Sequence, residues 1–137
     1  MASNKTVIVT GASQGIGAAV VRAFLGRGHN VVATSRSVSK AGFAPSPNLA
    51  LVDGDIGQAA TAARIAQTAI SKFGSIDSLV NNAGVFLVKP FTDYTAEDFR
   101  SLVFGRWIAS SSSTAIWANR VPTATCSDSR SWWRPSA

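Results

Sequence analysis

A glycine-rich segment close to the N-terminus constrains the fold of this chain more than any other feature. It reads TGASQGIG over residues 10–17 and lies between a short apolar run and a helical pattern. Gly11 allows a sharp turn, Gly15 allows phosphate groups to approach the backbone, and Gly17 allows a helix to pack closely against a strand. The first N–H groups of the helix would then face a bound anion. A turn that serves chain geometry alone is the alternative.

Strand and helix patterns alternate along the first two thirds of the chain. Strands are predicted at Lys5–Thr10, Asn30–Ser35, Leu49–Val52 and Ile76–Asn81, and helices at Gly15–Leu25, at Ile56–Phe73 and from a capping pattern at Thr95–Asp98 onward. This alternation favours a parallel sheet with right-handed crossovers. The predicted fold class is α/β, a Rossmann-like doubly wound parallel sheet with helices on both faces and its C-terminal strands missing.

The character of the sequence changes at Phe104. Residues 105–137 contain all four Trp, the single Cys and eight Ser, and they follow neither a helical nor a strand period. A segment without such a pattern cannot offset the entropy lost on ordering its backbone. We therefore expect one ordered domain over residues 1–104 and an atypical tail over residues 105–137 that is frame-shifted or disordered.

Charge and cysteine content narrow the function classes. The net charge of +6 divides equally between residues 1–104 and 105–137 and forms no basic run, so we expect no nucleic-acid partner. Cys126 is alone and can form neither an internal disulfide nor a zinc site. No apolar run reaches the ~20 residues of a membrane span, and the N-terminus lacks a signal-peptide pattern. We expect a cytoplasmic protein without membrane attachment.

Three motifs in a fixed order resemble the short-chain dehydrogenases/reductases. They are TGxxxGIG at residues 10–17, Asp55-Ile56 after the third predicted strand, and Asn81-Asn82-Ala83-Gly84 at the end of the fourth. The resemblance covers about residues 5–104, the first two fifths of a family chain of ~250 residues. It implies an NAD(P)-binding Rossmann region over residues 1–104 of an oxidoreductase. Such an enzyme transfers hydride between a nicotinamide and a small carbonyl or alcohol substrate.

The resemblance also implies how the motif residues bind the dinucleotide. The residues that would line the pyrophosphate and the adenosine ribose are Gly11, Ser13, Gln14, Gly15 and Ile16, together with Gly17. Asp55 would accept a hydrogen bond from the adenine amino group, beside the Ile56 backbone. The ribose and nicotinamide side would be flanked by Asn82, Ala83 and Gly84. The alternatives are that Asp55 is an ordinary turn residue and that Asn82 ties a strand end to its neighbours.

The end of the second predicted strand bears on the type of dinucleotide. NAD enzymes tend to carry a carboxylate there that binds the ribose 2′-hydroxyl, whereas an arginine accommodates a 2′-phosphate. The sequence reads Thr34-Ser35-Arg36-Ser37 and contains no carboxylate. Arg36 therefore favours NADP(H) over NAD(H). The alternative is that Arg36 is a solvated loop cation.

The family's catalytic residues have no counterpart in this sequence. By resemblance, catalysis would need a Tyr with a Lys four residues later, a Ser and an Asn. The single Tyr, Tyr94, is followed four residues later by Asp98, no Lys follows Lys89, and Asn119 lacks the family surroundings. We expect no catalytic residue in this chain and interpret Tyr94 as a loop or packing residue.

Three functions remain open at this point. The chain is the N-terminal part of an NADP(H)-dependent oxidoreductase, a non-catalytic dinucleotide-binding or interaction module, or a frame-shifted product without function. A parallel sheet that lacks its later strands leaves an apolar edge uncovered. Two copies of the chain could associate through such an edge, so a homo-oligomer is a further expectation.

Overall fold

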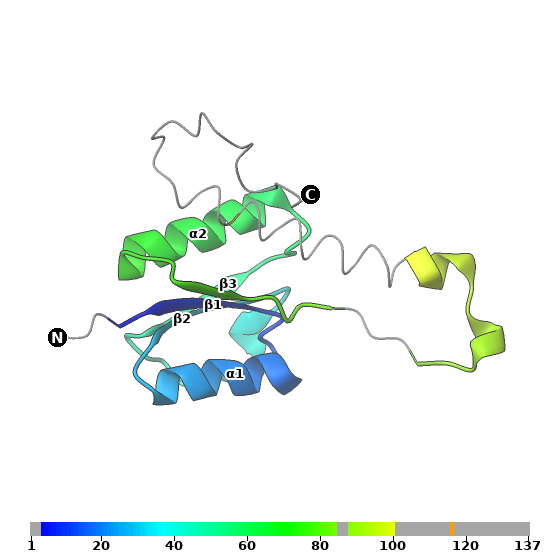
Figure 1. The fold of residues 1–137 in the computed structure, drawn as a ribbon, viewed down its shortest axis with the longest axis horizontal. Coiled ribbons are helices and arrows are strands. Elements are labelled where there is room, and N and C mark those ends of the chain that lie inside the picture. Colours follow the sequence, from blue (N-terminus) through cyan, green and yellow to red (C-terminus); the bar gives the residue numbers. More distant parts are fainter. Residues whose placement is uncertain (1–3, 85–87, 101–115, 117–137) are drawn as a thin grey trace, which may run out of the picture.

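The computed structural model describes residues 4–84, 88–100 and 116. Strands β1 (Thr6–Thr10), β2 (Asn30–Ser35), β3 (Leu49–Asp53) and β4 (Ser78–Val80) form a parallel sheet in the order β3-β2-β1-β4. Helix α1 (Gly15–Gly26) connects β1 to β2, and helix α2 (Ala59–Phe73) connects β3 to β4. The two helices cover opposite faces of the sheet (Figure 1). The predicted α/β fold class is confirmed.

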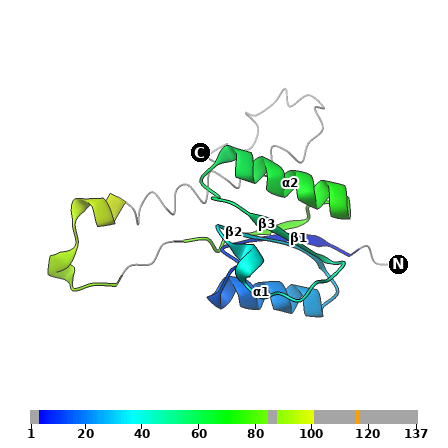
Figure 2. The same ribbon diagram turned by 180° about the vertical axis from the view of Figure 1, so that it is seen from behind.

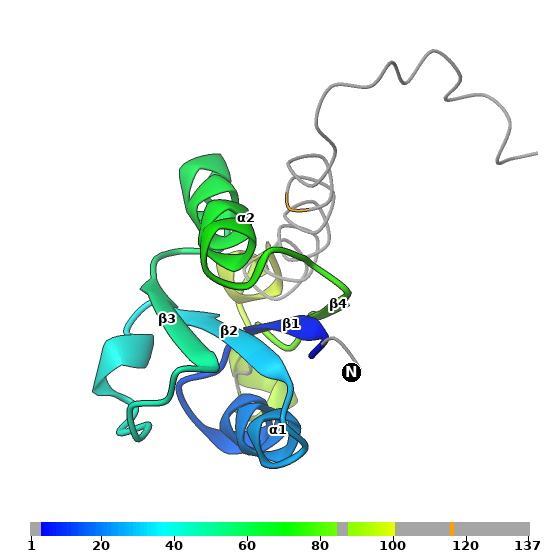
Figure 3. The same cartoon turned by 90° about the vertical axis from the view of Figure 1, so that its left-hand side faces the viewer.

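Strand β1 illustrates why the core has two halves. All five of its residues are buried. Val7 and Val9 pack in a cluster on the α1 side, whereas Ile8 packs in a cluster on the α2 side. Successive side chains of a strand point to opposite faces, and a sheet with both faces covered needs apolar residues at every position. Figure 3 shows the sheet between the two helices.

Most element bounds agree with the sequence patterns to within one residue. The exceptions are β4, which covers Ser78–Val80 and not the predicted Ile76–Asn81, and the start of α2. The helix begins at Ala59, whereas the apolar pattern predicts a start at Ile56. The reason is a turn, because the N–H of Gly57 donates to Oδ1 of Asp55 at 2.9 Å and the N–H of Gln58 donates to the Asp55 carbonyl at 3.0 Å. Two short 3-10 helices, η1 (Val38–Lys40) and η2 (Phe91–Asp93), have no signal in the sequence pattern.

Strand β3 is an edge of the sheet, and α2 supplies side chains to it. Lys72 Nζ donates to the Leu49 carbonyl at 2.6 Å, and the Arg64 guanidinium donates to the Asp53 carbonyl. Both residues lie on one stripe of α2, eight positions apart, because residues four apart share a helix face. Two outer carbonyls of the edge strand are therefore occupied by cationic side chains.

The segment over residues 88–100 begins a further helix at the predicted place. Residues 96–100 are helical. Thr95 Oγ1 accepts the N–H of Asp98 at 3.2 Å, and Asp98 Oδ2 accepts the N–H of Thr95 at 2.9 Å. This reciprocal pair is a capping box, which satisfies N–H groups at a helix start. Figure 2 shows the segment beyond the carboxyl ends of the strands, and Phe99 on it is 67% exposed.

Ile116 belongs to the predicted atypical tail and is described by the structure. It is helical and fully buried in the α2-side cluster, with Ile8, Ile65 and Ile76. The other residues of the range 105–137, including Cys126, lie outside the described residues. The tail therefore contributes one apolar side chain to the core, while its assignment as frame-shifted or disordered stays a prediction.

Candidate functional site

A cleft of about 810 Å³ opens at the carboxyl ends of the strands. Its walls come from the β1–α1 turn, the segment after β2, the β3–α2 turn and the residues after β4. The lining residues are Gly11, Ser13, Gln14, Gly15, Ile16, Thr34, Ser35, Arg36, Ser37, Gly54, Asp55, Ile56, Gly57, Gln58, Asn82, Ala83 and Gly84. Every site residue predicted from the sequence lines this cleft except Gly17.

A second hollow of about 680 Å³ lies against the outer edge of β3, between that strand and α2. Arg64, Thr68 and Lys72 of α2 line it together with residues of β3. None of the predicted site residues is among its lining residues. The hollow at the carboxyl ends of the strands, where open parallel sheets bind their ligands, is therefore the candidate site.

Gly11 and Gly17 fix the turn that forms one wall of the cleft. A Cβ on Gly17 would lie 2.2 Å from the Gly11 carbonyl oxygen and 2.5 Å from Asn82 Nδ2. A Cβ on Gly11, where φ is +65°, would lie 2.8 Å from the Cα of Ala83. Helix α1 can approach β1 and the end of β4 this closely because both positions lack a side chain.

Gly15 differs from these two glycines because the space beside it is open. Its φ is +57°, and no atom lies within 4 Å of where its Cβ would be. It is the first residue of α1, whose N-cap residue Gln14 makes no side-chain cap and whose first turn contains no acidic residue. The leading N–H groups of α1 and its positive dipole end are thus available to an anion in the cleft.

Thr10 and Asn82 join the glycine turn to the end of β4. Asn82 Nδ2 donates to the carbonyls of Thr10 at 3.2 Å and Gly11 at 3.1 Å. The buried Thr10 hydroxyl accepts the N–H of Asn82 at 3.1 Å and the N–H of Ala83 at 3.0 Å. Asn82 therefore joins the end of β4 to the end of β1 and the glycine turn. The sequence does not indicate this role of Thr10, because a threonine at the end of an apolar strand gives no sign of a hydrogen-bond partner 72 residues away.

Asp55 lines the cleft and also shapes the turn before α2. Its Oδ1 accepts the Gly57 N–H at 2.9 Å, as the turn alternative requires. Ile56 lines the cleft beside it. The N–H of Gly54 donates to the Ser35 carbonyl at 2.9 Å, which joins this turn to the end of β2. The turn and the end of β2 thus form a continuous wall.

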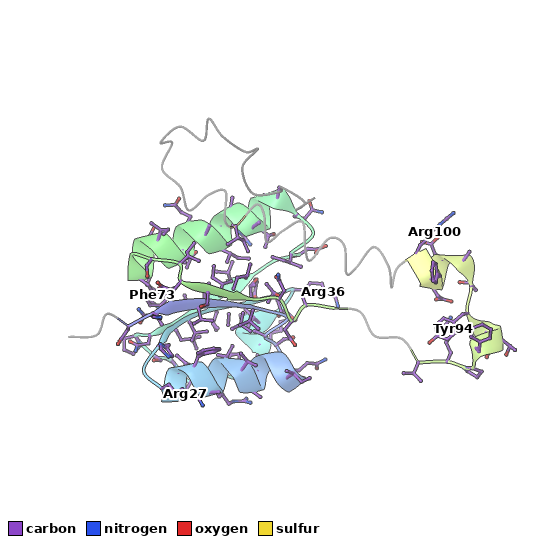
Figure 4. All side chains as sticks on the ribbon, in the orientation of Figure 1. Arg27, Arg36, Phe73, Tyr94 and Arg100 are labelled. Carbon is purple, nitrogen blue, oxygen red and sulfur yellow. The ribbon has the colours of Figure 1, made fainter. Side chains whose placement is uncertain are left out.

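Arg36 supplies the positive charge of the cleft. It is exposed, and among the described lining residues it is the one basic side chain, with Asp55 the one acidic side chain. The salt bridges between described residues do not include Arg36. Figure 4 shows Arg36 at the carboxyl ends of the strands. The motifs do not indicate the neighbouring Thr34, Ser35 and Ser37, which also line the cleft. The Thr34 hydroxyl is buried and donates to the Val52 carbonyl at 2.8 Å.

Tyr94 lies outside the cleft, as the sequence predicts for a loop or packing residue. Lys89 Nζ lies 5.8 Å from the centre of the Tyr94 ring and 2.5 Å from Asp98 Oδ2. The hydrogen bond from Lys89, with two further hydrogen bonds from Thr95, lowers the pKa of Asp98 to about 2. Lys89, Tyr94 and Asp98 thus stabilise the segment that begins the helix at residues 96–100.

The described part of the chain contains neither a membrane-spanning helix nor a cluster of metal-binding side chains. No helix within residues 4–84 and 88–100 has the length and apolar character needed to cross a bilayer. The same residues include no group of three or more His, Cys, Asp or Glu side chains that could hold a metal ion.

Sequence comparisons show which known proteins this chain resembles. Residues 5–106 match the model of the short chain dehydrogenase family. L-fucose dehydrogenase of Rattus norvegicus is 37% identical over 105 residues, which cover 74% of this chain and 38% of the rat protein. 3beta-hydroxysteroid dehydrogenase 1 of Eggerthella lenta is 34% identical over 110 residues, covering 72% and 41% respectively. The chain spans less than half the length of these relatives.

Solved structures show the same fold. A short-chain dehydrogenase/reductase of Brucella melitensis superposes with a TM-score of 0.67 at 27% identity, covering 86% of this chain and 51% of that one. A tyrosine-to-phenylalanine variant of ElxO with NADPH bound superposes with a TM-score of 0.70 at 26% identity, covering 83% and 49%. Because the family model matches residues 5–106 of the 137, this chain belongs to the short-chain dehydrogenase family.

Proposed function

We propose that the cleft at the carboxyl ends of the strands binds a dinucleotide. The observation that carries this proposal is that one cleft gathers the glycine turn, Asp55 and the residues after β4. Gly15 leaves open space beside the leading N–H groups of α1, which suits the pyrophosphate. Asp55 and Ile56 form the adenine wall, while Ala83 and Gly84 lie toward the nicotinamide. Ser13, Gln14 and Ile16 complete the phosphate side.

The dinucleotide is NADP(H) in preference to NAD(H). Support comes from the charge of the cleft, since Arg36 is the one basic side chain among its described lining residues. Ser35 and Ser37 flank it and add hydroxyl groups. A guanidinium can form charge-assisted hydrogen bonds with a 2′-phosphate, each worth about 1.5–3 kcal/mol. This corresponds to a preference of roughly ten- to a hundredfold.

The protein of which this cleft forms the N-terminal part is an oxidoreductase that acts on a small alcohol or carbonyl. The relatives named above are dehydrogenases. A bound dinucleotide would supply hydride to a carbonyl or accept it from an alcohol, and the residues described here would bind and orient the dinucleotide. We further propose that this chain alone performs no hydride transfer, because its sequence lacks a Tyr followed four residues later by a Lys.

Calorimetric titration of the purified chain with NADPH and NADH tests the binding proposal. We expect binding of both, with NADPH bound roughly ten- to a hundredfold more tightly. Equal affinities would remove the role given to Arg36. Failure to bind either cofactor would remove the function given to the cleft.

Two measurements test the proposed lack of hydride transfer and its origin. The absorbance of NADPH should stay constant when the chain is mixed with a panel of small carbonyl compounds. Translation of the coding DNA after codon 103 in the other two frames should reveal an Asn-bearing helix, then a Ser and then Tyr-x-x-x-Lys. If neither frame contains that series, or if NADPH is oxidised at an enzymatic rate, the frame-shift explanation is wrong, and in the second case residues 105–137 must supply the chemistry.

A further inference from the structure

Asp53 holds the segment that follows β2 through two hydrogen bonds to one residue. It is the last residue of β3, and its carboxylate accepts the Ser39 N–H at 2.9 Å on Oδ1 and the Ser39 hydroxyl at 2.5 Å on Oδ2. These hydrogen bonds, that of the Ser39 side chain above all, lower the pKa of Asp53. Asp53 does not line the cleft, and no motif discussed above includes it.

The segment that carries Arg36 is fastened on both sides. On one side, Ser35 is paired with Asp53 in the sheet, and the Ser35 carbonyl accepts the Gly54 N–H at 2.9 Å. On the other side, Val38 is fully buried in the α1-side cluster and Ser39 is bound to the Asp53 carboxylate. Arg36 and Ser37 are the two residues between these attachments, and both line the cleft.

We propose that Asp53, acting through Ser39, is a positioning residue for discrimination at the ribose 2′ position of the dinucleotide. This inference rests on the function proposed above. The carboxylate fixes the backbone on which Arg36 stands, so less conformational freedom is lost when the guanidinium meets a 2′-phosphate. Asp53 therefore contributes to the selection of the cofactor without touching it.

The charge of Asp53 and its positioning role predict opposite effects on anion binding when Asp53 is removed, which makes the inference testable. Removing a negative charge near the cleft would by itself strengthen the binding of an anion. Releasing the segment that carries Arg36 would weaken it. Ser39→Ala separates the two effects, because it removes the hydroxyl that binds Oδ2 and leaves the net charge unchanged.

Asp77 provides a matched control at the other end of the sheet. Its Oδ2 accepts a backbone N–H, that of Thr6 at 2.8 Å, and a serine hydroxyl, that of Ser75 at 2.9 Å. Asp77→Ala therefore removes a carboxylate with a similar set of donors, far from the cleft. Asp53→Ala, Ser39→Ala and Asp77→Ala are compared with the parent chain.

The probes are 2′,5′-ADP and 5′-AMP, which share the adenosine 5′-phosphate and differ only in the 2′-phosphate. In calorimetric titrations, Asp53→Ala and Ser39→Ala should each weaken binding of 2′,5′-ADP by roughly 2- to 12-fold, the cost of ordering one long side chain. Their affinity for 5′-AMP, and both affinities of Asp77→Ala, should stay close to those of the parent. Hydrogen exchange at the Ser39 amide should accelerate in Asp53→Ala, which verifies that the segment is released.

Each other outcome overturns a defined part of the inference. If the parent prefers 2′,5′-ADP and both variants retain its preference, the positioning role of Asp53 is wrong while the proposed function stands. If Asp53→Ala strengthens 2′,5′-ADP binding and Ser39→Ala leaves it unchanged, Asp53 acts through its charge alone. A parent chain that binds both probes equally removes the role of Arg36 and that of Asp53 with it.

Discussion

The carboxyl and amino ends of the sheet contain the same kinds of local structure, a glycine at positive φ and an aspartate that accepts two hydrogen bonds. They differ in whether the nearby helix ends have N–H groups free for a ligand. At the carboxyl end, Gly15 has a φ of +57° and open space beside it, and at the amino end Gly28 has a φ of +79° and equally open space. Each end also has an aspartate that accepts a backbone N–H and a serine hydroxyl. Figure 4 marks the amino end by Arg27 and Phe73 and the carboxyl end by Arg36.

The difference lies in which helix ends meet each end of the sheet. Both helices finish at the amino end, where the N–H of Gly28 donates to the Leu25 carbonyl and the N–H of Gly74 donates to the Ile70 carbonyl. Both begin at the carboxyl end, where neither N-cap residue makes a side-chain cap. At the C-terminal ends these N–H groups already have partners, whereas the uncapped N–H groups at the N-terminal ends can bind a ligand. The polarity of the helices therefore decides which end becomes the site.

Gly17→Ala should have the largest effect, because it disrupts the turn at the carboxyl end. Its Cβ would meet the backbone carbonyl of Gly11, which cannot move without displacing β1. We expect a loss in the free energy of unfolding of about 3 kcal/mol or more, the upper end for overpacked sites. Gly26→Ala is the control in the same helix, since its Cβ meets no atom within 4 Å, and it should leave stability unchanged or slightly higher. Urea denaturation measures both.

Arg36→Asp should reverse the cofactor preference of the carboxyl end. The variant replaces a donor to the 2′-phosphate with a carboxylate that can accept the ribose 2′-hydroxyl. We expect NADPH affinity to fall by roughly ten- to a hundredfold and NADH to become the tighter ligand. Arg27→Asp makes the same change of charge at the amino end and should alter neither affinity. Titration calorimetry that shows equal losses in both variants would indicate a general charge effect.

Gly15→Ala and Gly28→Ala compare the two ends directly. Each places a Cβ at positive φ, and both should lose a similar amount of stability, about 1–2 kcal/mol. Gly15→Ala should also weaken NADPH binding by at least about tenfold, because its methyl group enters the space proposed for the pyrophosphate. Alanine is the better choice than valine, since a β-branched residue is strained at φ +57° even without a ligand. Unchanged NADPH affinity in Gly15→Ala contradicts the proposed phosphate position.

Acid should weaken the attachment made by Asp53, and this is the smallest effect expected. The pKa of Asp53 is lowered in the folded chain from its ordinary value of 3.8, so its contribution to stability is present above that value. The contribution is lost as the pH falls through the lower pKa of the folded state. The difference in unfolding free energy between the parent and Asp53→Ala should therefore be constant from pH 7 to about pH 5 and shrink below pH 4. A difference that does not shrink as the pH falls below 4 would show that the charge of Asp53 is not involved.

The sequence predicts the parts of the molecule that depend on local pattern. Buried β-branched runs indicate the strands, and the spacing of Gly11, Gly15 and Gly17 indicates the turn from which the cleft is built. The start of α2 is predicted three residues too early because Ile56 continues the apolar pattern while Asp55 closes a turn. Contacts made by single side chains over long separations have no local signal. Those of Asn82 with Thr10 and of Asp53 with Ser39 follow from the fold alone.

The two cationic side chains that α2 directs to β3 affect the edge at which this sheet can gain a further strand. An unpaired strand offers carbonyl and N–H groups on which a strand of another molecule can assemble. Lys72 and Arg64 occupy the outer carbonyls of Leu49 and Asp53, so an incoming strand would have to displace both cations. In the described part of the chain, β4 pairs with β1 alone and has no such guard. Among the described residues, these cations thus disfavour the addition of a strand at β3, and β4 lacks them.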